Sequence, residues 1–268
     1  MIIINPKQGL CNRMRAIDSA IAWSKINNRK LFVIWEMNDL CNCKLSKLFT
    51  DSQEITYLLE VRNKTFIKFI NQFSPVFFSR FNNCYLDQEK IKKIQGDKSE
   101  FEKLSLHKTV YIRTFSRFYQ IPSLHAFSSF QPRRCLQKII DSYKVNDFIG
   151  VHVRRTDNKQ SIMFSPLNEF IDCMKNEVEK NNNVKYFLST DCPFVEAELR
   201  DIFQDKIVSH RKTSLNRNNP HAIKDALVDL YCLANCRKII RSYYSSFSAT
   251  ATAINKIDSI TIKAGLCN

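Results

Sequence analysis

The sequence contains little glycine and no long run of apolar residues. Only four of its 268 residues are glycine, which argues against an all-β protein with many tight turns. No G-x-G-x-x-G segment occurs, so the dinucleotide-binding fingerprint is absent. No run approaches the roughly 20 apolar residues of a membrane span, and the short apolar start, residues 1–4, lacks the pattern of a signal peptide. We therefore expect a cytoplasmic protein without a membrane span.

The cysteines are numerous but lack the spacing of a metal site. Ten occur; Cys41 and Cys43 form a C-x-C pair, and Cys232 and Cys236 lie four apart on a predicted helix. There is no C-x-x-C pair and no Cys/His set with zinc-finger spacing. This pattern predicts buried free thiols in a reducing compartment and no bound metal.

Acidic residues are outnumbered by basic ones. Lys and Arg total 41 and Asp and Glu total 26, a net charge of +15. Such a balance attracts anionic partners, namely nucleic acid, an acidic membrane or phosphorylated small molecules. We favour a solvated basic surface, because much of the excess lies in Lys- and Asn-rich segments such as 175–185. A basic nucleic-acid-binding protein remains an alternative, although no motif for that function is present.

Hydrophobic residues make up 44% of the chain, enough for a packed core. An apolar strand over 1–5, a helix over 13–27 and a second strand over 31–35 predict a parallel β-loop-α-β unit. Strands and helices also alternate from about residue 134 to the end. We predict an α/β protein with two Rossmann-like domains facing each other across a cleft. The N-terminal α/β domain spans 1–130 and the nucleotide-binding domain spans 131–268.

Residues 40–105 are less regular. Six phenylalanines recur over 66–81, which indicates either a helix packed on the core or an exposed patch that meets an acceptor; they are Phe66, Phe69, Phe73, Phe77, Phe78 and Phe81. We favour core packing.

Polar residues follow each predicted strand of the C-terminal half. Ligands of open parallel sheets bind at the carboxyl ends of the strands. The residues at these ends are Arg154, Arg155 and Asp157; Thr190 and Asp191; His210, Arg211 and Lys212; and 242–246. The guanidinium of Arg154 is a planar fork that binds a phosphate with two hydrogen bonds. A structural Arg–Asp bridge is the alternative for this motif.

Other candidate residues lie on helices or in the N-terminal half. Ser245 and Ser246 stand where a helix begins, and the backbone N–H groups there suit a phosphate, although capping alone explains them equally well. Asp191 and Asp229 are candidates for hydrogen bonds from ribose or guanine, or else solvated carboxylates. Arg13 follows Gly9 in a strand-to-helix loop and is expected to face the diphosphate from the opposite domain.

The segment His-Val-Arg-Arg-Thr-Asp (152–157) resembles the first signature of the α1,6-fucosyltransferases. The stretch 9–35 is similar to the glycine-plus-arginine loop and helix of the bacterial nodulation-factor enzymes among them. Three further segments resemble their strand ending in Thr-Asp, their helix with a guanine-side Asp and their serine-rich phosphate loop: 186–191, 226–231 and 244–246. The resemblance covers 1–36 and 148–255 in the same order, and 40–130 matches nothing.

The resemblance implies a GT-B-like pair of domains, GDP-fucose as the donor, a glycan acceptor, and an inverting transfer that needs no metal or cofactor. It assigns Arg154 to the β-phosphate, where it stabilises the leaving GDP. His152 and Arg155, from the same motif, are expected in the donor site. Asp191 and Asp229 are expected at the nucleoside and Ser246 at the phosphates. The lack of a D-x-D motif agrees with metal independence.

Two departures from the family pattern matter. Asn158 stands where the core fucosyltransferases have Lys after the motif, and no carboxylate follows closely. Cys192 replaces the second acid of their Asp-Asp pair. The general base is therefore unassigned among Asp157, Asp18 and Glu36, and a glycosyltransferase that uses another nucleotide-sugar donor remains an alternative.

Overall fold

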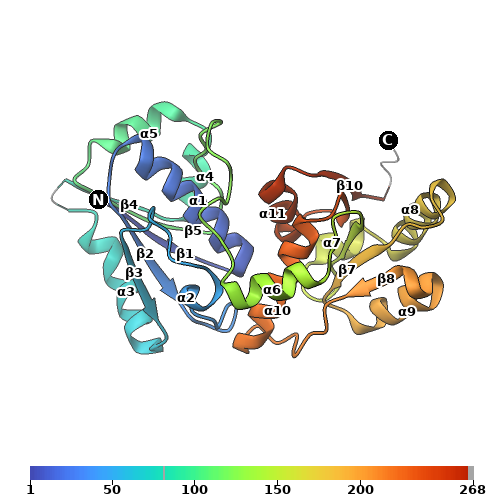
Figure 1. The fold of residues 1–268 in the computed structure, drawn as a ribbon. Coiled ribbons are helices and arrows are strands. Elements are labelled where there is room, and N and C mark those ends of the chain that lie inside the picture. Colours follow the sequence, from blue (N-terminus) through green and yellow to red (C-terminus); the bar gives the residue numbers. More distant parts are fainter. Residues whose placement is uncertain (81, 265–268) are drawn as a thin grey trace. The chain divides into compact units, whose positions relative to one another are not determined.

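The computed structural model describes residues 1–80 and 82–264. The chain divides into two compact units. The first unit comprises Met1–Arg133 and Asn216–Ile223, and the second comprises Arg134–Leu215 and Lys224–Asn268. The predicted division after residue 130 lies close to Arg133, but the segment Asn216–Ile223 returns to the first unit. Figure 1 shows a parallel sheet flanked by helices in each unit.

The first unit contains a five-stranded parallel sheet in the order β3-β2-β1-β5-β4. Its strands are β1 (Ile2–Pro6), β2 (Leu31–Glu36), β3 (Tyr57–Val61), β4 (Asn83–Leu86) and β5 (Thr109–Thr114). Its helices are α1 (Leu10–Ile26), α2 (Leu45–Leu48), α3 (Lys64–Phe77), α4 (Gln88–Ile94) and α5 (Lys98–Ser105). The predicted β-loop-α-β unit is confirmed, because β1 pairs in parallel with β2 and α1 packs against both.

Helix α3 corrects one prediction. Its inward side is narrow: Ile70, and Phe78 just after the helix, pack on the sheet, where Phe78 stacks on Tyr111 at 4.9 Å between ring centroids. The other phenylalanines of the helix point to solvent, with exposed fractions of 45% for Phe66, 54% for Phe69, 49% for Phe73 and 66% for Phe77. The prediction that these rings pack in the core is therefore wrong. The apolar residues of the helix cover more of its circumference than can face one sheet, so some of them are left on the solvent side. Phe81 lies outside the described residues.

The second unit contains a second five-stranded parallel sheet in the order β10-β9-β6-β7-β8. Its strands are β6 (Ile149–Val153), β7 (Tyr186–Thr190), β8 (Ile207–Ser209), β9 (Lys238–Ser242) and β10 (Asp258–Ile262). Its helices are α6 (Arg134–Ser142), α7 (Lys159–Phe164), α8 (Leu167–Lys180), α9 (Pro193–Phe203) and α11 (Ser246–Asn255), with α10 (Pro220–Ala234) beginning in the first unit. Two parallel sheets with helices between their strands confirm the predicted α/β, Rossmann-like class.

The central strand β6 is buried along its whole length and serves both faces of the sheet. Val151 and Val153 join the core cluster that includes Phe170 of α8. On the opposite face, Gly150 leaves room for α10, where an added Cβ would come within 2.9 Å of Leu233. Successive residues of a strand point to opposite faces, so the loop after β6 is anchored from two sides.

No helix within residues 1–80 and 82–264 is long and apolar enough to cross a membrane. The prediction of mostly buried thiols holds for Cys11, Cys41, Cys43, Cys232 and Cys236. Cys135 is exposed, because it points away from the apolar side of α6.

Candidate functional site in the second unit

The strand order of the second unit creates a switch point. The chain runs from central β6 outward through β7 and β8, and then returns to place β9 on the other side of β6. Connections on opposite sides of the sheet leave a crevice beyond the carboxyl ends of β6 and β9, which is where open α/β sheets bind ligands. Arg154 follows β6 there, and residues 243–245 lead from β9 into α11.

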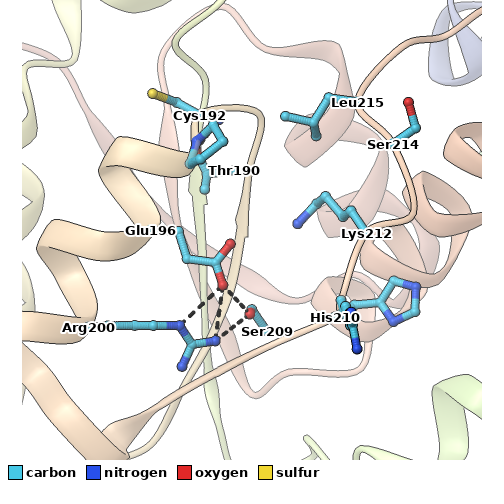
Figure 2. Close-up of a pocket in the computed structure, with 11 residues that line it drawn as sticks. Thr190, Cys192, Glu196, Arg200, Ser209, His210, Lys212, Ser214 and Leu215 are labelled. Carbon is cyan, nitrogen blue, oxygen red and sulfur yellow. Dashed lines mark hydrogen bonds and ion pairs between the residues drawn. The ribbon is translucent and has the colours of Figure 1, made fainter.

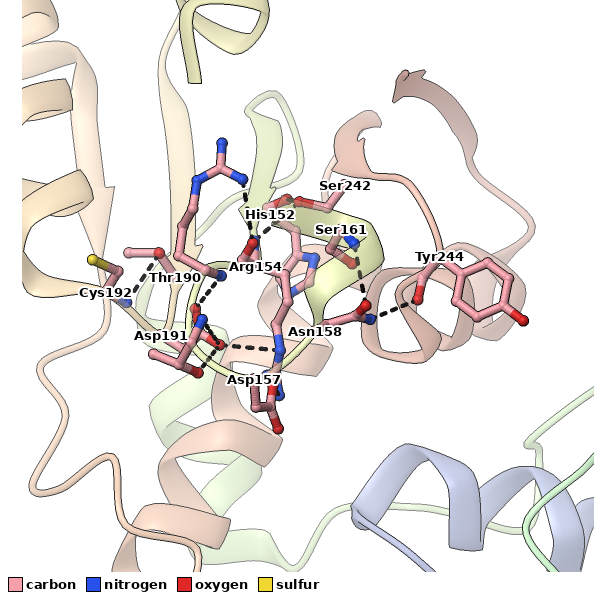
Figure 3. Close-up of polar contacts among 12 residues, drawn as sticks. His152, Arg154, Asp157, Asn158, Ser161, Thr190, Asp191, Cys192, Ser242 and Tyr244 are labelled. Carbon is pink, nitrogen blue, oxygen red and sulfur yellow. Dashed lines mark hydrogen bonds and ion pairs between the residues drawn. The ribbon is translucent and has the colours of Figure 1, made fainter. Parts of the chain in front are cut away.

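Hydrogen bonds fasten the two loops of this switch point to each other (Figure 3). The backbone N–H of Arg154 donates to Ser242 Oγ at 3.0 Å. Asn158 Nδ2 donates to the carbonyl of Tyr244 at 2.9 Å, and Ser161 Oγ donates to the carbonyl of Tyr243 at 2.7 Å. Tyr244 has a left-handed backbone, with φ of 57°, which favours glycine in most loops. This loop therefore has a fixed backbone shape set by its neighbours.

The guanidinium of Arg154 lies at the strand edge between two carboxylates. Its Nε is 3.0 Å from Asp191 Oδ2, and its Nη2 pairs with Asp157 Oδ1. The Arg154 side chain is 20% exposed and that of Asp157 is 50% exposed. The Arg–Asp bridge considered from the sequence thus exists in this structure. Arg154 is not turned into the interior, and an anion reaching it would replace Asp157 first, because that carboxylate is the more exposed partner.

Asp191 positions the loop after β6. Its Oδ1 accepts from the backbone N–H of Arg155 at 2.7 Å, and its Oδ2 accepts from Thr156 Oγ1 at 2.6 Å. With Arg154 also bound, both oxygens are engaged. The guanidinium of Arg155 turns back to the carbonyl of Ser165 at 2.5 Å. The side chains of Asp191 and Arg155 therefore bind other protein groups in this structure. The guanidinium of Arg154 lies at the carboxyl edge of the sheet.

The N-terminus of α11 completes the switch point. Ser245 is its N-cap but makes no side-chain capping hydrogen bond, and the first turn, which begins at Ser246, has no acidic residue. Backbone N–H groups at a helix N-terminus attract anions. His152, on β6, stacks on Phe247 of this turn with 5.1 Å between ring centroids. Burial lowers the pKa of His152 to about 3, so the ring is neutral at pH 7.

A cavity of about 390 Å³ opens beyond the ends of β7 and β8 (Figure 2). Its walls come from the end of β7, from α9 and from the loop after β8; they are Thr190, Cys192, Pro193, Glu196, Arg200, Ser209, His210, Arg211, Lys212, Ser214 and Leu215. Small-molecule pockets have volumes of roughly 300–1,000 Å³. The sequence identified the strand-end residues of this lining, but not Glu196 or Arg200, because nothing in an amphipathic helix marks the side that borders a cavity.

Asp229 lies beneath this cavity rather than in it. The residue is 2% exposed. Its Oδ2 accepts from Ser189 Oγ at 2.8 Å and is 3.2 Å from Lys212 Nζ. Its Oδ1 has no hydrogen-bond partner among the described residues. Burial raises the pKa of Asp229, against the opposing charge of Lys212. Lys212 thus covers the carboxylate that the sequence assigned to the nucleoside, and its own Nζ is buried against that carboxylate.

Arg13 corrects another expectation. The residue is fully buried in the first unit. Its Nε donates to the carbonyl of Gln8 at 2.6 Å, its Nη2 donates to Asn38 Oδ1 at 2.9 Å, and its guanidinium lies 4.9 Å from the centre of the Trp35 ring. Because all these contacts bind the loops of its own unit, Arg13 does not present its charge to a diphosphate.

The three candidates for a general base differ in exposure. Asp18 is buried and accepts from the backbone N–H of Phe127 at 2.8 Å. Glu36 is 2% exposed and lies 2.5 Å from Lys7 Nζ. Only Asp157, of these three, has a half-exposed side chain. Among the described residues, no three His, Cys, Asp or Glu side chains group closely enough to hold a metal ion.

The two parallel Rossmann-like sheets give this chain the GT-B fold of solved fucosyltransferases. The α1,6-fucosyltransferase NodZ soaked with GDP-fucose is 20% identical, with a TM-score of 0.63 over 94% of this chain and 92% of that one. A NodZ structure comes from Bradyrhizobium.

Two other solved structures have similar folds. A variant of FUT1 from Arabidopsis thaliana in complex with GDP is 12% identical, with a TM-score of 0.64 over 97% of this chain and 69% of that one. POFUT1 in complex with GDP is 10% identical, with a TM-score of 0.59 over 99% and 98% of the two chains. No protein-family model and no curated protein matches the sequence. At these identities the likeness establishes the fold.

Proposed function

We propose that this chain is an inverting, metal-independent glycosyltransferase that transfers fucose from GDP-fucose to a hydroxyl of a glycan. The observation that carries the proposal is the guanidinium of Arg154 at the switch point, close in the fold to the N-terminus of α11, which lacks a side-chain cap. The structures with the same fold include NodZ soaked with GDP-fucose and POFUT1 with GDP. Arginine and helix N-termini are the two protein groups best suited to a diphosphate.

The layout of the second unit suits a nucleoside diphosphate. The diphosphate would lie at the ends of β6 and β9, against Arg154 and the first turn of α11. The nucleoside would occupy the cavity beyond β7 and β8, whose lining includes His210, Arg211 and Lys212. Since β7 directly adjoins β6, one extended ligand reaches both places. Asp191 would act as a positioning residue that aims Arg154 at the phosphate.

The proposed step follows from charge. An acceptor oxygen attacks the anomeric carbon from the side opposite the diphosphate, and the bond from that carbon to the phosphate oxygen breaks. Its electron pair stays on GDP, where Arg154 and the N–H groups of α11 stabilise the new charge. The hydroxyl proton must go to a base. When Arg154 turns to the phosphate it releases Asp157, and we assign the proton to that carboxylate.

Donor turnover tests the proposal through a matched pair of arginine variants. Arg154→Ala should lower GDP release from GDP-fucose by about 10²–10³-fold, because it removes a charge that develops its full interaction only in the transition state. Arg154→Lys should recover only part of the rate, since a lysine lacks the planar fork. The control is Arg134→Ala, an exposed arginine at the start of α6, which should change nothing. Unchanged turnover in the Arg154→Ala variant would reject the site.

A second donor class is favoured by one observation. Lys212 covers Asp229, so the carboxylate that the sequence assigned to guanine is not exposed to the N–H groups of a base in this structure. A thermal-shift panel of GDP, UDP and dTDP separates the donors, because at equal concentration the nucleotide that binds the folded state more tightly raises the melting temperature more. Stronger stabilisation by UDP or dTDP than by GDP would replace GDP-fucose as the donor but keep the glycosyltransferase.

A further inference from the structure

Helix α3 has a second apolar side that covers nothing. Five of its side chains point away from the sheet and are 45–66% exposed: Phe66, Phe69, Phe73, Val76 and Phe77. They follow the spacing of one helical face, and the rings of Phe69 and Phe73 contact each other at 4.5 Å between centroids. Monomeric proteins rarely expose several large apolar side chains together, and such patches mark interaction surfaces.

The opposite side of α3 explains why this face stays outward. Asn71 Oδ1 accepts from Lys7 Nζ at 3.1 Å, and Ser74 is buried. Ile70 and Phe78 pack on the sheet. These contacts fix the rotation of the helix, so the exposed rings cannot turn inward without breaking them. The aromatic face is therefore a built feature of the surface.

The charges around this face identify its partner. Residues 62–80 contain four basic residues and no acidic one. Arg62, Lys64, Lys68 and Arg80 are all exposed. An amphipathic helix with phenylalanines on one side and basic residues beside them is typical of helices that lie in the interface of an anionic membrane. The net charge of +15 adds attraction to the same kind of surface.

We propose that α3 docks this protein on the surface of an anionic lipid bilayer, with its phenylalanine rings in the boundary between headgroups and acyl chains. The basic residues at both ends of the helix then lie at the level of the lipid headgroups. This inference does not depend on the proposed glycosyl transfer, because docking is measured without a donor.

Co-sedimentation of the full chain with vesicles tests the proposal. Binding should be strong to phosphatidylcholine vesicles that contain about one third phosphatidylserine and weak to phosphatidylcholine alone. The variant Phe69→Ser/Phe73→Ser should bind at least about tenfold more weakly. The variant Arg62→Gln/Lys64→Gln/Lys68→Gln should bind about a hundredfold more weakly, since each basic residue near such a surface contributes roughly fivefold.

Two control variants remove the same groups elsewhere. Phe194→Ser replaces a phenylalanine that is 85% exposed in the second unit. Lys92→Gln/Lys93→Gln/Lys98→Gln removes three exposed charges from the first unit. Each should change vesicle binding by less than about threefold. Equal losses in the basic variants of α3 and of 92–98 would overturn the proposal, because binding would then reflect net charge alone.

Two further results would also overturn it. One is the absence of vesicle binding by the unaltered chain. The other is that the chain binds no vesicles but forms a concentration-dependent dimer without lipid, as measured by analytical ultracentrifugation. This dimer would be lost in the Phe69→Ser/Phe73→Ser variant. That outcome would assign the face to a second copy of the chain. Melting curves establish whether each variant folds. If Phe69→Ser/Phe73→Ser does not fold, the Arg62→Gln/Lys64→Gln/Lys68→Gln variant and its control at 92–98 still test the proposal.

Discussion

The two carboxylates on Arg154 should affect nucleotide binding in opposite directions. Asp157 is half exposed and holds Nη2, where it competes with an incoming phosphate. Asp191 is 17% exposed, holds Nε and fixes the loop around it. The substitution Asp157→Asn should therefore tighten GDP binding, and Asp191→Asn should weaken it. Both substitutions remove one negative charge near the same guanidinium, so simple charge repulsion predicts tighter binding in both.

The expected size follows from exposure. A solvent-exposed ion pair contributes about 0.5–1 kcal/mol. GDP no longer has to break this pair in Asp157→Asn, so its dissociation constant should fall about two- to fivefold. Hydrogen bonds to a charged acceptor contribute about 1.5–3 kcal/mol each. Asp191 accepts from Arg155 N–H at 2.7 Å and Thr156 Oγ1 at 2.6 Å. Weakening them should raise the dissociation constant at least about tenfold.

Isothermal titration of GDP into the three proteins measures these constants, and donor turnover supplies a second readout. If Asp157 is the base, Asp157→Asn should bind GDP more tightly while transfer to an acceptor falls by about 10²–10⁴-fold. Weaker GDP binding by Asp157→Asn would refute the reasoning, because it would show that this carboxylate holds Arg154 in its binding position. Tighter GDP binding by both Asp157→Asn and Asp191→Asn would show that net charge alone explains the effect.

Three other predictions concern stability and metal ions. His152 has a folded pKa of about 3 against an ordinary value of 6.5. Between these values the unfolded chain binds a proton that the folded chain does not, so the stability falls as the pH drops below 6.5. Urea unfolding should show a loss of at most about 2 kcal/mol from pH 7.5 to pH 5, and the His152→Phe variant should not show this loss. Gly150→Ala should destabilise the second unit by about 1–3 kcal/mol in urea unfolding, because the new Cβ would meet Leu233 at 2.9 Å and Ile239 at 3.2 Å; an unaltered midpoint would mean that α10 shifts freely. Transfer measured with excess EDTA should equal transfer without it, and a loss that Mg²⁺ or Mn²⁺ restores would contradict a metal-independent step.

The regular elements of the second unit could be predicted from sequence because their patterns are local. Apolar runs such as 149–153 mark buried strands, and Pro193 marks the first turn of α9. The sequence does not predict the short strand Asn83–Leu86, and for Tyr57–Val61 it indicates only a short element over 55–59 of undefined type. Both strands lie at the two edges of the first sheet, where one-sided burial leaves a weak alternation of polar and apolar residues.

The sequence by itself determined that polar groups gather at the carboxyl ends of parallel strands, and that Arg154 lies at one of them. Strand periodicity and the order of elements suffice for this, since both follow from backbone geometry. Only the tertiary structure decided which charges meet. It buried Arg13 among loop carbonyls, covered Asp229 with Lys212, and turned the phenylalanines of α3 to solvent. A side chain's exposure depends on contacts with residues far away in the chain, and local sequence does not encode which of them arrive.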